Sequence, residues 1–117
     1  MTDDGGAFEV SRTGPGEAEA EVLPGAAAFR GHFPDRPVLP AIAQIGLLAR
    51  LAREAAGGGT LHGIETMRLE RQAIPGDRLH ARLERPDAAG RIRFRLRRGE
   101  DTVSAGTLLW GDDGDAE

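Results

Sequence analysis

Few side chains in this sequence can transfer a proton. There are three histidines, His32, His62 and His80, together with 19 Asp and Glu residues. All 15 basic residues are Arg, and Lys, Tyr and Cys do not occur. A Schiff-base lysine, a tyrosine acid, a thiolate nucleophile and a disulfide are therefore excluded. Acid–base chemistry falls to histidine and the carboxylates.

His32 is the histidine best placed for catalysis. It lies in the sequence GHFP at 31–34, where three prolines within residues 34–40 stiffen the backbone. The helix start predicted at 40–42 would offer free backbone N–H groups, which can polarise a carbonyl oxygen. From the residues alone, His32 could also be an ordinary loop residue, and that alternative stays open.

The other candidates for chemistry are weaker. His62 and His80 lie in predicted strands, where a histidine is more often structural, and no HxH or HExxH spacing indicates a metal site. Ser11 and Ser104 lack the nucleophile-elbow context of a serine hydrolase. The glycine-rich runs do not match a phosphate-binding loop. We therefore expect neither a metal nor a cofactor.

Alternation of apolar and polar residues predicts most of the strands. Two runs, at 7–12 and 16–23, come first, and short turns separate four later runs. The later runs lie at 60–73, 78–85, 91–98 and 102–110. Every second residue from 91 to 97 is Arg, so one face of that strand is strongly basic. This face is either simply solvated or a docking face for an acidic partner or a phosphate.

A helix is predicted between the two groups of strands. Residues 24–40 form a stiff, irregular loop, and 40–56 follow with only four polar side chains. A helix that is apolar around most of its circumference is buried on most sides. Three glycines at 57–59 end it. The predicted fold class is α+β, a curved antiparallel sheet wrapped around a central helix.

Length and composition suit one small globular domain. The chain has 117 residues, 39% of them hydrophobic and 29% charged, so we expect a single domain over 1–117 with flexible tails at about 1–6 and 111–117. No apolar run could span a membrane, and the acidic start is unlike a targeting peptide. We expect a cytoplasmic protein without membrane contact. The net charge of −4 argues against nucleic acid as a partner.

Two segments resemble the motifs of one enzyme family. Residues 29–41, FRGHFPDRPVLPA, are similar to the GHFPGxPxMPG motif of the β-hydroxyacyl-acyl-carrier-protein dehydratases. Residues 63–71 and 74–79, GIETMRLER and IPGDRL, resemble that family's later GIDxxRFRRPVxPGDxL segment. The resemblance covers roughly residues 8–110. It implies the hot-dog fold, a homodimer or higher oligomer of dimers, and an acyl thioester carried by acyl carrier protein or coenzyme A as substrate.

The resemblance also implies roles for the residues of the first motif. His32 corresponds to the base that abstracts the α-proton of a 3-hydroxyacyl thioester. Ala41 corresponds to the glycine whose backbone N–H binds the thioester oxygen. With Phe33 and Ile42, the helix start would line a narrow, mostly apolar tunnel for the acyl chain.

The chain departs from the family pattern further along the helix. The family's catalytic acid, which comes from the opposite protomer, corresponds to Gly46, and a helix Gln one turn later corresponds to Arg50. Glycine cannot deliver the proton that the departing hydroxide needs. We expect Arg50 to approach the site from the helix and to bind an anionic group or order water in the space at Gly46.

Three functions remain in competition. The first is a 3-hydroxyacyl thioester dehydratase of fatty-acid, polyketide or secondary lipid biosynthesis, with altered or weak chemistry. The second is a non-catalytic hot-dog subunit that binds an acyl carrier or pairs with an active partner. The third is an acyl thioesterase. The intact GHFP sequence around His32 favours the first, and the loss of the acid at Gly46 favours the second.

Overall fold

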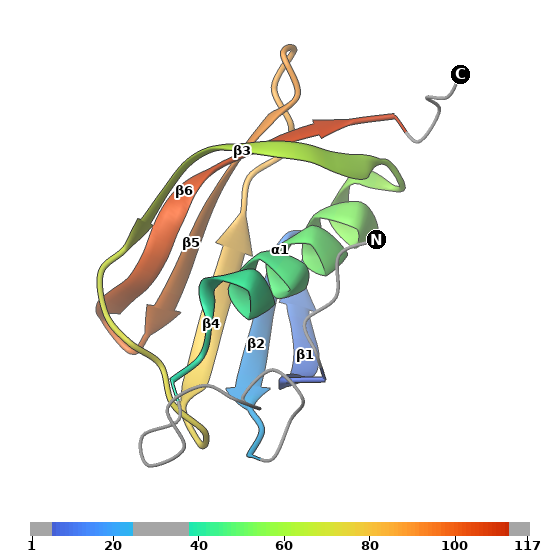
Figure 1. Ribbon diagram of the computed structural model, residues 1–117. Helices are drawn as coiled ribbons and strands as arrows, with labels where there is room; N and C mark the ends of the chain where they lie inside the picture. Colours follow the sequence, from blue (N-terminus) through green and yellow to red (C-terminus); the bar gives the residue numbers. More distant parts are fainter. Residues whose placement is uncertain (1–5, 25–37, 113–117) are drawn as a thin grey trace.

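Six strands and one helix make up the described part of the chain. The computed structural model describes residues 6–24 and 38–112 (Figure 1). Its elements are β1 (Phe8–Gly14), β2 (Glu17–Val22), α1 (Ala41–Ala56), β3 (Thr60–Leu69), β4 (Arg78–Leu83), β5 (Arg91–Arg98) and β6 (Asp101–Gly111). The strands form one sheet in the order β1-β2-β4-β5-β6-β3, and all neighbours are antiparallel.

The sheet curves around α1, which lies across its inner face (Figure 1). This is the α+β hot-dog arrangement that the sequence predicts. β3 follows α1 directly in the chain but pairs with β6 at the far edge, so its other edge has no neighbouring strand among the described residues. The arrangement leaves the start of α1 next to the end of β3, and this junction is where the candidate site lies.

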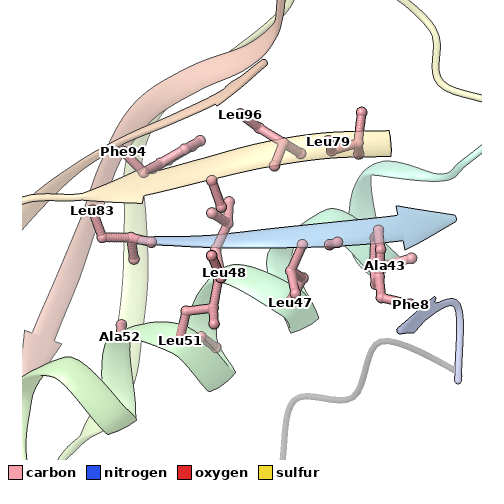
Figure 2. Close-up of a cluster of buried hydrophobic side chains, with 14 of the residues drawn as sticks. Phe8, Ala43, Leu47, Leu48, Leu51, Ala52, Leu79, Leu83, Phe94 and Leu96 are labelled. Atoms are coloured by element: carbon pink, nitrogen blue, oxygen red, sulfur yellow. The ribbon is translucent and has the colours of Figure 1, made fainter. Parts of the chain in front are cut away.

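Alternation along the strands builds the core that holds α1 in place. In β4 and β5 every second side chain is buried, as period two requires of a sheet with one covered face. Leu47 and Leu48 of α1 are fully buried and lie in one cluster with Leu79, Phe94 and Leu96 of the sheet (Figure 2). Close packing of these side chains fixes both the depth and the rotation of the helix.

The helix is less enclosed than its composition predicts. Eight of its 16 residues are buried, whereas Ile42 is 64% exposed and Arg50, Arg53 and Glu54 face solvent. The reason is geometric, because the sheet of a single chain covers α1 from one side. The predicted end at the glycines is confirmed, since Gly57 adopts the left-handed conformation (φ 76°) that ends many helices.

Three predicted boundaries need correction. Pro40 is the N-cap of α1, not its first helical residue. β6 runs to Gly111 and so takes in the first residue expected of the C-terminal tail. β3 ends at Leu69, four residues earlier than predicted. Beyond Leu69 the chain turns inward: Ala73 is fully buried and its carbonyl accepts a hydrogen bond from the N–H of Leu39 at 2.7 Å.

Candidate active site

The residues predicted to form the site are only partly within the described ranges. His32 and Phe33 lie outside the described residues, so their roles stay predictions. Ala41, Ile42 and Gly46 lie in the first two turns of α1, with Arg50 one turn further on. The geometry of the site therefore has to be built from the start of this helix.

The start of α1 carries backbone N–H groups that bond to none of the residues the structure describes. Pro40, the N-cap, provides no side-chain cap, and its carbonyl accepts only from Ala43 and Gln44. Within the described ranges, the N–H groups of Ala41 and Ile42 have no hydrogen-bond partner. No acidic residue stands in the first turn to neutralise the positive end of the helix dipole. This end of α1 can therefore donate to a carbonyl oxygen or an oxyanion.

A cavity of about 400 Å³ opens beside these donors. That volume is within the range of small-molecule sites. Its walls come from the segment entering α1, from the first turns of α1, and from the end of β3 and the residues after it. They are Val38, Leu39, Pro40, Ala41, Gln44, Leu69, Glu70, Arg71 and Gln72. The segment entering α1 contributes only apolar side chains, which suits an acyl chain.

Gln44 is a wall residue that the sequence did not mark as part of the site. Its side chain is 3% exposed, and its Oε1 is buried without a hydrogen-bond partner. Leaving such an acceptor unsatisfied costs about 1–3 kcal/mol. It lies three positions after Ala41, so both residues are on one face of α1. This spacing is the signal that could have identified it.

Gly46 and Arg50 are not among the cavity walls. Successive helix residues advance by about 1.5 Å and turn by about 100°. Gly46 is therefore about 140° around the helix axis from Ala41. Arg50 lies about 13 Å along the axis from Ala41, on the opposite side of the helix. Arg50 is exposed and Gly46 is buried. Within one chain Arg50 does not line this cavity, and its expected role at the site stays a prediction.

The remaining histidines lie on strands. His62 is exposed on β3, and His80 is half-buried on β4 with its Nε2 3.6 Å from a carboxylate oxygen of Glu17. Over residues 6–24 and 38–112, no three His, Asp or Glu side chains gather as metal ligands would. No helix in this part of the chain is long and apolar enough to cross a membrane.

Comparisons with known sequences place most of the chain within one pattern. The sequence model of the ApeI-like family, described as ApeI dehydratase, matches residues 10–107. The 3-hydroxyacyl-[acyl-carrier-protein] dehydratase FabZ of Bacillus licheniformis is 44% identical over 48% of this chain and 44% of that enzyme. FabZ of Clostridium perfringens is 40% identical over 56% and 53% of the two chains. The chain thus spans about half the length of the curated relatives it matches.

Solved structures share the fold over nearly the whole chain. One is the dehydratase heterocomplex ApeI:P from Xenorhabdus doucetiae, with a TM-score of 0.71 and 27% identity over 87% of this chain and 93% of that one. A second, an uncharacterized protein from Erwinia carotovora subsp. atroseptica, has a TM-score of 0.65 and 23% identity over 90% and 91%. The second likeness concerns the fold alone.

Proposed function

The chain belongs to the ApeI-like dehydratase family, and from this membership and the geometry of the helix start we propose that it dehydrates 3-hydroxyacyl thioesters. The observation that supports the proposal is a helix start whose first N–H groups, those of Ala41 and Ile42, bond to no described residue, with Ala41 lining the 400 Å³ cavity. An acyl group has an apolar chain and a polarisable thioester carbonyl. The apolar segment that leads into α1 can contact the acyl chain, and the N–H groups at the helix start can donate to the carbonyl oxygen.

The reaction removes a proton from C2 and hydroxide from C3 of the substrate. In the proposed mechanism His32 takes the C2 proton, and the thioester oxygen gains negative charge as it does so. The N–H of Ala41 stabilises that charge at the positive end of α1. The C3–O bond then breaks, the hydroxide leaves as water once it receives a proton, and a 2-enoyl thioester remains.

A mechanism within one chain lacks an evident donor for the proton that the departing hydroxide needs. Gly46 cannot supply it, and loss of a general acid typically lowers a rate by about 10²–10⁴-fold. A guanidinium group is a poor proton donor, although Arg50 could bind an anion or orient water. We therefore propose slow dehydration by this chain alone.

The direct test is hydration of a crotonyl thioester, the reverse reaction, by the purified chain. Wild type should turn over and His32→Ala should lose at least about 100-fold of that rate, as expected for a lost base. His62→Ala, an exposed strand histidine, is the matched control and should keep the wild-type rate. Equal rates for wild type and His32→Ala would refute His32 as the base.

A second candidate is a subunit whose site is completed by a different hot-dog chain. Gly46 favours it, because the family resemblance implies that base and acid come from opposite protomers. The similar solved structure is described as a heterocomplex. In such a pair, this chain would supply His32 and its partner the acid. Absence of turnover by the chain alone, with turnover after mixing with an acid-bearing hot-dog chain, would favour this reading over the first.

A further inference from the structure

A row of arginines crosses the outer face of the sheet, away from α1. Arg82 of β4 lies directly opposite Arg95 of β5, and Arg95 lies opposite Ala105 of β6. On the other side of Ala105, Arg68 of β3 completes the row. Since neighbouring strands are about 4.8 Å apart, Arg95 and Arg68 stand about 10 Å apart across Ala105. The small side chain leaves a recess between two guanidinium groups.

A second row of side chains lies beside the first. Thr66 of β3 is opposite Thr107 of β6, and Thr107 is opposite Arg93 of β5. The backbone N–H of Glu84 donates to the carbonyl of Arg93 at 2.9 Å, which places Glu84 at the end of this row. Together the rows enclose a hollow of about 630 Å³. It is lined by Thr66, Arg68, Arg82, Glu84, Arg93, Phe94, Arg95, Ala105, Gly106 and Thr107.

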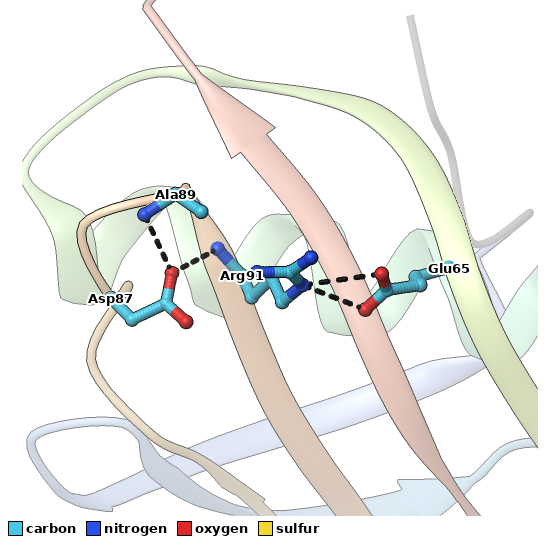
Figure 3. Close-up of polar contacts among 4 residues, drawn as sticks. All are labelled: Glu65, Asp87, Ala89 and Arg91. Carbon is cyan, nitrogen blue, oxygen red and sulfur yellow. Dashed lines mark hydrogen bonds and ion pairs between the residues drawn. The ribbon is translucent and has the colours of Figure 1, made fainter.

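The arginines of β5 are paired at the ends of the strand and unpaired in its middle. Arg91 donates to both carboxylate oxygens of Glu65 at 3.0 and 3.2 Å (Figure 3). Arg98 is 2.7 Å from Asp77. By contrast, Arg93, Arg95 and Arg97 make no side-chain hydrogen bond or ion pair with any described residue. Of these three arginines, Arg93 and Arg95 line the hollow, whereas Arg97 lies outside it.

The charges on the walls do not balance. Four guanidinium groups face one carboxylate, that of Glu84. The ion pairs that Arg68 and Arg82 make are long and exposed, at 3.5 Å to Glu70 and 3.7 Å to Glu17, and pairs of this kind are weak. Like charges directly opposite each other in a sheet are destabilising, so Arg82 and Arg95 repel. An anion held between the rows would relieve this repulsion.

We propose that this hollow binds a molecule carrying two or more phosphoryl groups. The planar guanidinium fork fits phosphate oxygens with two parallel hydrogen bonds, and Thr66 and Thr107 offer hydroxyl donors beside it. A phosphoanhydride concentrates several negative charges in a small volume, whereas a single carboxylate would neutralise only one arginine. A flat membrane fits poorly, because the floor at Ala105 is recessed below the arginines. The site is independent of the thioester reaction, since it lies on the opposite face of the sheet.

The test is calorimetric titration of the whole protein with inorganic pyrophosphate at an ionic strength of about 0.15 M, where charges outside the hollow are screened over about 8 Å. Wild type should bind pyrophosphate at least about tenfold more tightly than orthophosphate. Each arginine would contribute charge-assisted hydrogen bonds to the phosphoryl oxygens, so Arg93→Ser with Arg95→Ser should weaken binding by about 100-fold or more. Arg97→Ser is the matched control, on the same strand and face but outside the hollow, and should change affinity by less than about twofold.

Three results would overturn the proposal. The first is no heat of binding when pyrophosphate is added. The second is equal affinity of wild type and the double variant for pyrophosphate, and the third is an equal loss of affinity in Arg97→Ser. Binding of poly-glutamate or of anionic phospholipid vesicles that pyrophosphate does not displace would also count against it, and would instead assign the face to an acidic polypeptide or a membrane. All three substitutions lie on the outer face of the sheet, so each variant should fold. Circular dichroism of each variant verifies that the sheet is intact.

Discussion

At the scale of single residues, a substitution of Gly46 tests whether the proposed chemistry lacks a general acid. It is buried in the second turn of α1, so a Glu introduced there would be taken out of water, which raises a carboxyl pKa toward the range of a general acid. We expect Gly46→Glu to raise dehydration of a 3-hydroxybutyryl thioester by about 100-fold. Overpacking should cost about 1–3 kcal/mol of stability, partly offset by about 1 kcal/mol of helix propensity.

The control at this position is Gly46→Gln, which has the same size and no proton to give. It should match the stability of the Glu variant without the gain in rate. A folded Glu variant that gains nothing would mean that another group already supplies the proton or that this chain does not dehydrate alone. An equal gain in both variants would attribute the effect to packing.

Sequence reasoning found some residues of the site and missed others for an identifiable reason. Ala41 was predicted because its motif and the helix start coincide in the chain. Gln44 was missed because its importance comes from burial without a partner, a property that only packing creates. The roles of all the predicted site residues remain predictions, since the described residues do not test them: His32, Phe33, Ala41, Ile42, Gly46 and Arg50.

At the scale of elements, one ion pair ties the first hairpin to the end of the helix. Arg12 of β1 donates from Nε to Glu54 of α1 at 2.7 Å, and a second contact joins the same two side chains. This hydrogen bond with Arg12 lowers the pKa of Glu54 below its ordinary value. Both side chains are more than 40% exposed, so the pair should contribute less than about 1 kcal/mol.

The lowered pKa of Glu54 predicts how this contribution depends on pH. The contribution is present above the pKa of Glu54 in the unfolded chain, and it is lost as pH falls through the lower pKa of the folded state. Urea unfolding of wild type and Glu54→Gln should therefore differ near pH 7 and converge in acid. A difference that grows as pH falls would contradict the assignment of this pair.

The end of β3 could not be predicted from the pattern of apolar and polar residues. The alternation in β5 predicted its bounds at 91–98 correctly, because one face is buried and the other is not. The predicted run extends through residues 70–73, yet β3 ends at Leu69, and Ala73 is buried in the core with its carbonyl accepting from the N–H of Leu39. Such long-range contacts leave no local periodicity. The hollow on the outer face was hidden for the same reason, since it depends on the register of four strands.

At the scale of the whole molecule, the outer edge of β3 is the surface that we expect to pair with another chain. Among residues 6–24 and 38–112, no strand pairs with this edge of the ten-residue β3, and Leu69 at its end is 57% exposed. An uncovered strand edge favours pairing with another chain. We expect a homodimer, which sedimentation should report at twice the 12.4 kDa of the chain.

A charge at the edge of β3 should weaken this dimer without unfolding the chain. Leu69→Lys places an ammonium group in the expected seam, while Ile74→Lys, at a residue 49% exposed outside β3, is the control. Sedimentation at micromolar concentration should show a larger 12.4 kDa fraction for the first variant only. Wild type sedimenting only as a monomer would refute the expected dimer, and equal effects of both variants would place the contact elsewhere.

The central claim is that the start of α1 activates a thioester carbonyl, and Ala41→Pro tests it most directly. Proline removes the N–H of residue 41 yet is favoured at the first helical position, and Pro40 already has the extended conformation (φ −69°, ψ 155°) that a following proline requires. The fold should therefore survive. Ala41→Gly, which keeps the N–H, is the control.

The measurement is turnover of a 3-hydroxybutyryl thioester by the three proteins side by side. Loss of one oxyanion donor typically lowers kcat by about 10²–10³-fold, so Ala41→Pro should fall by that factor while Ala41→Gly stays near wild type. Unchanged turnover in a folded Ala41→Pro variant would contradict the claim that this helix start binds the thioester oxygen.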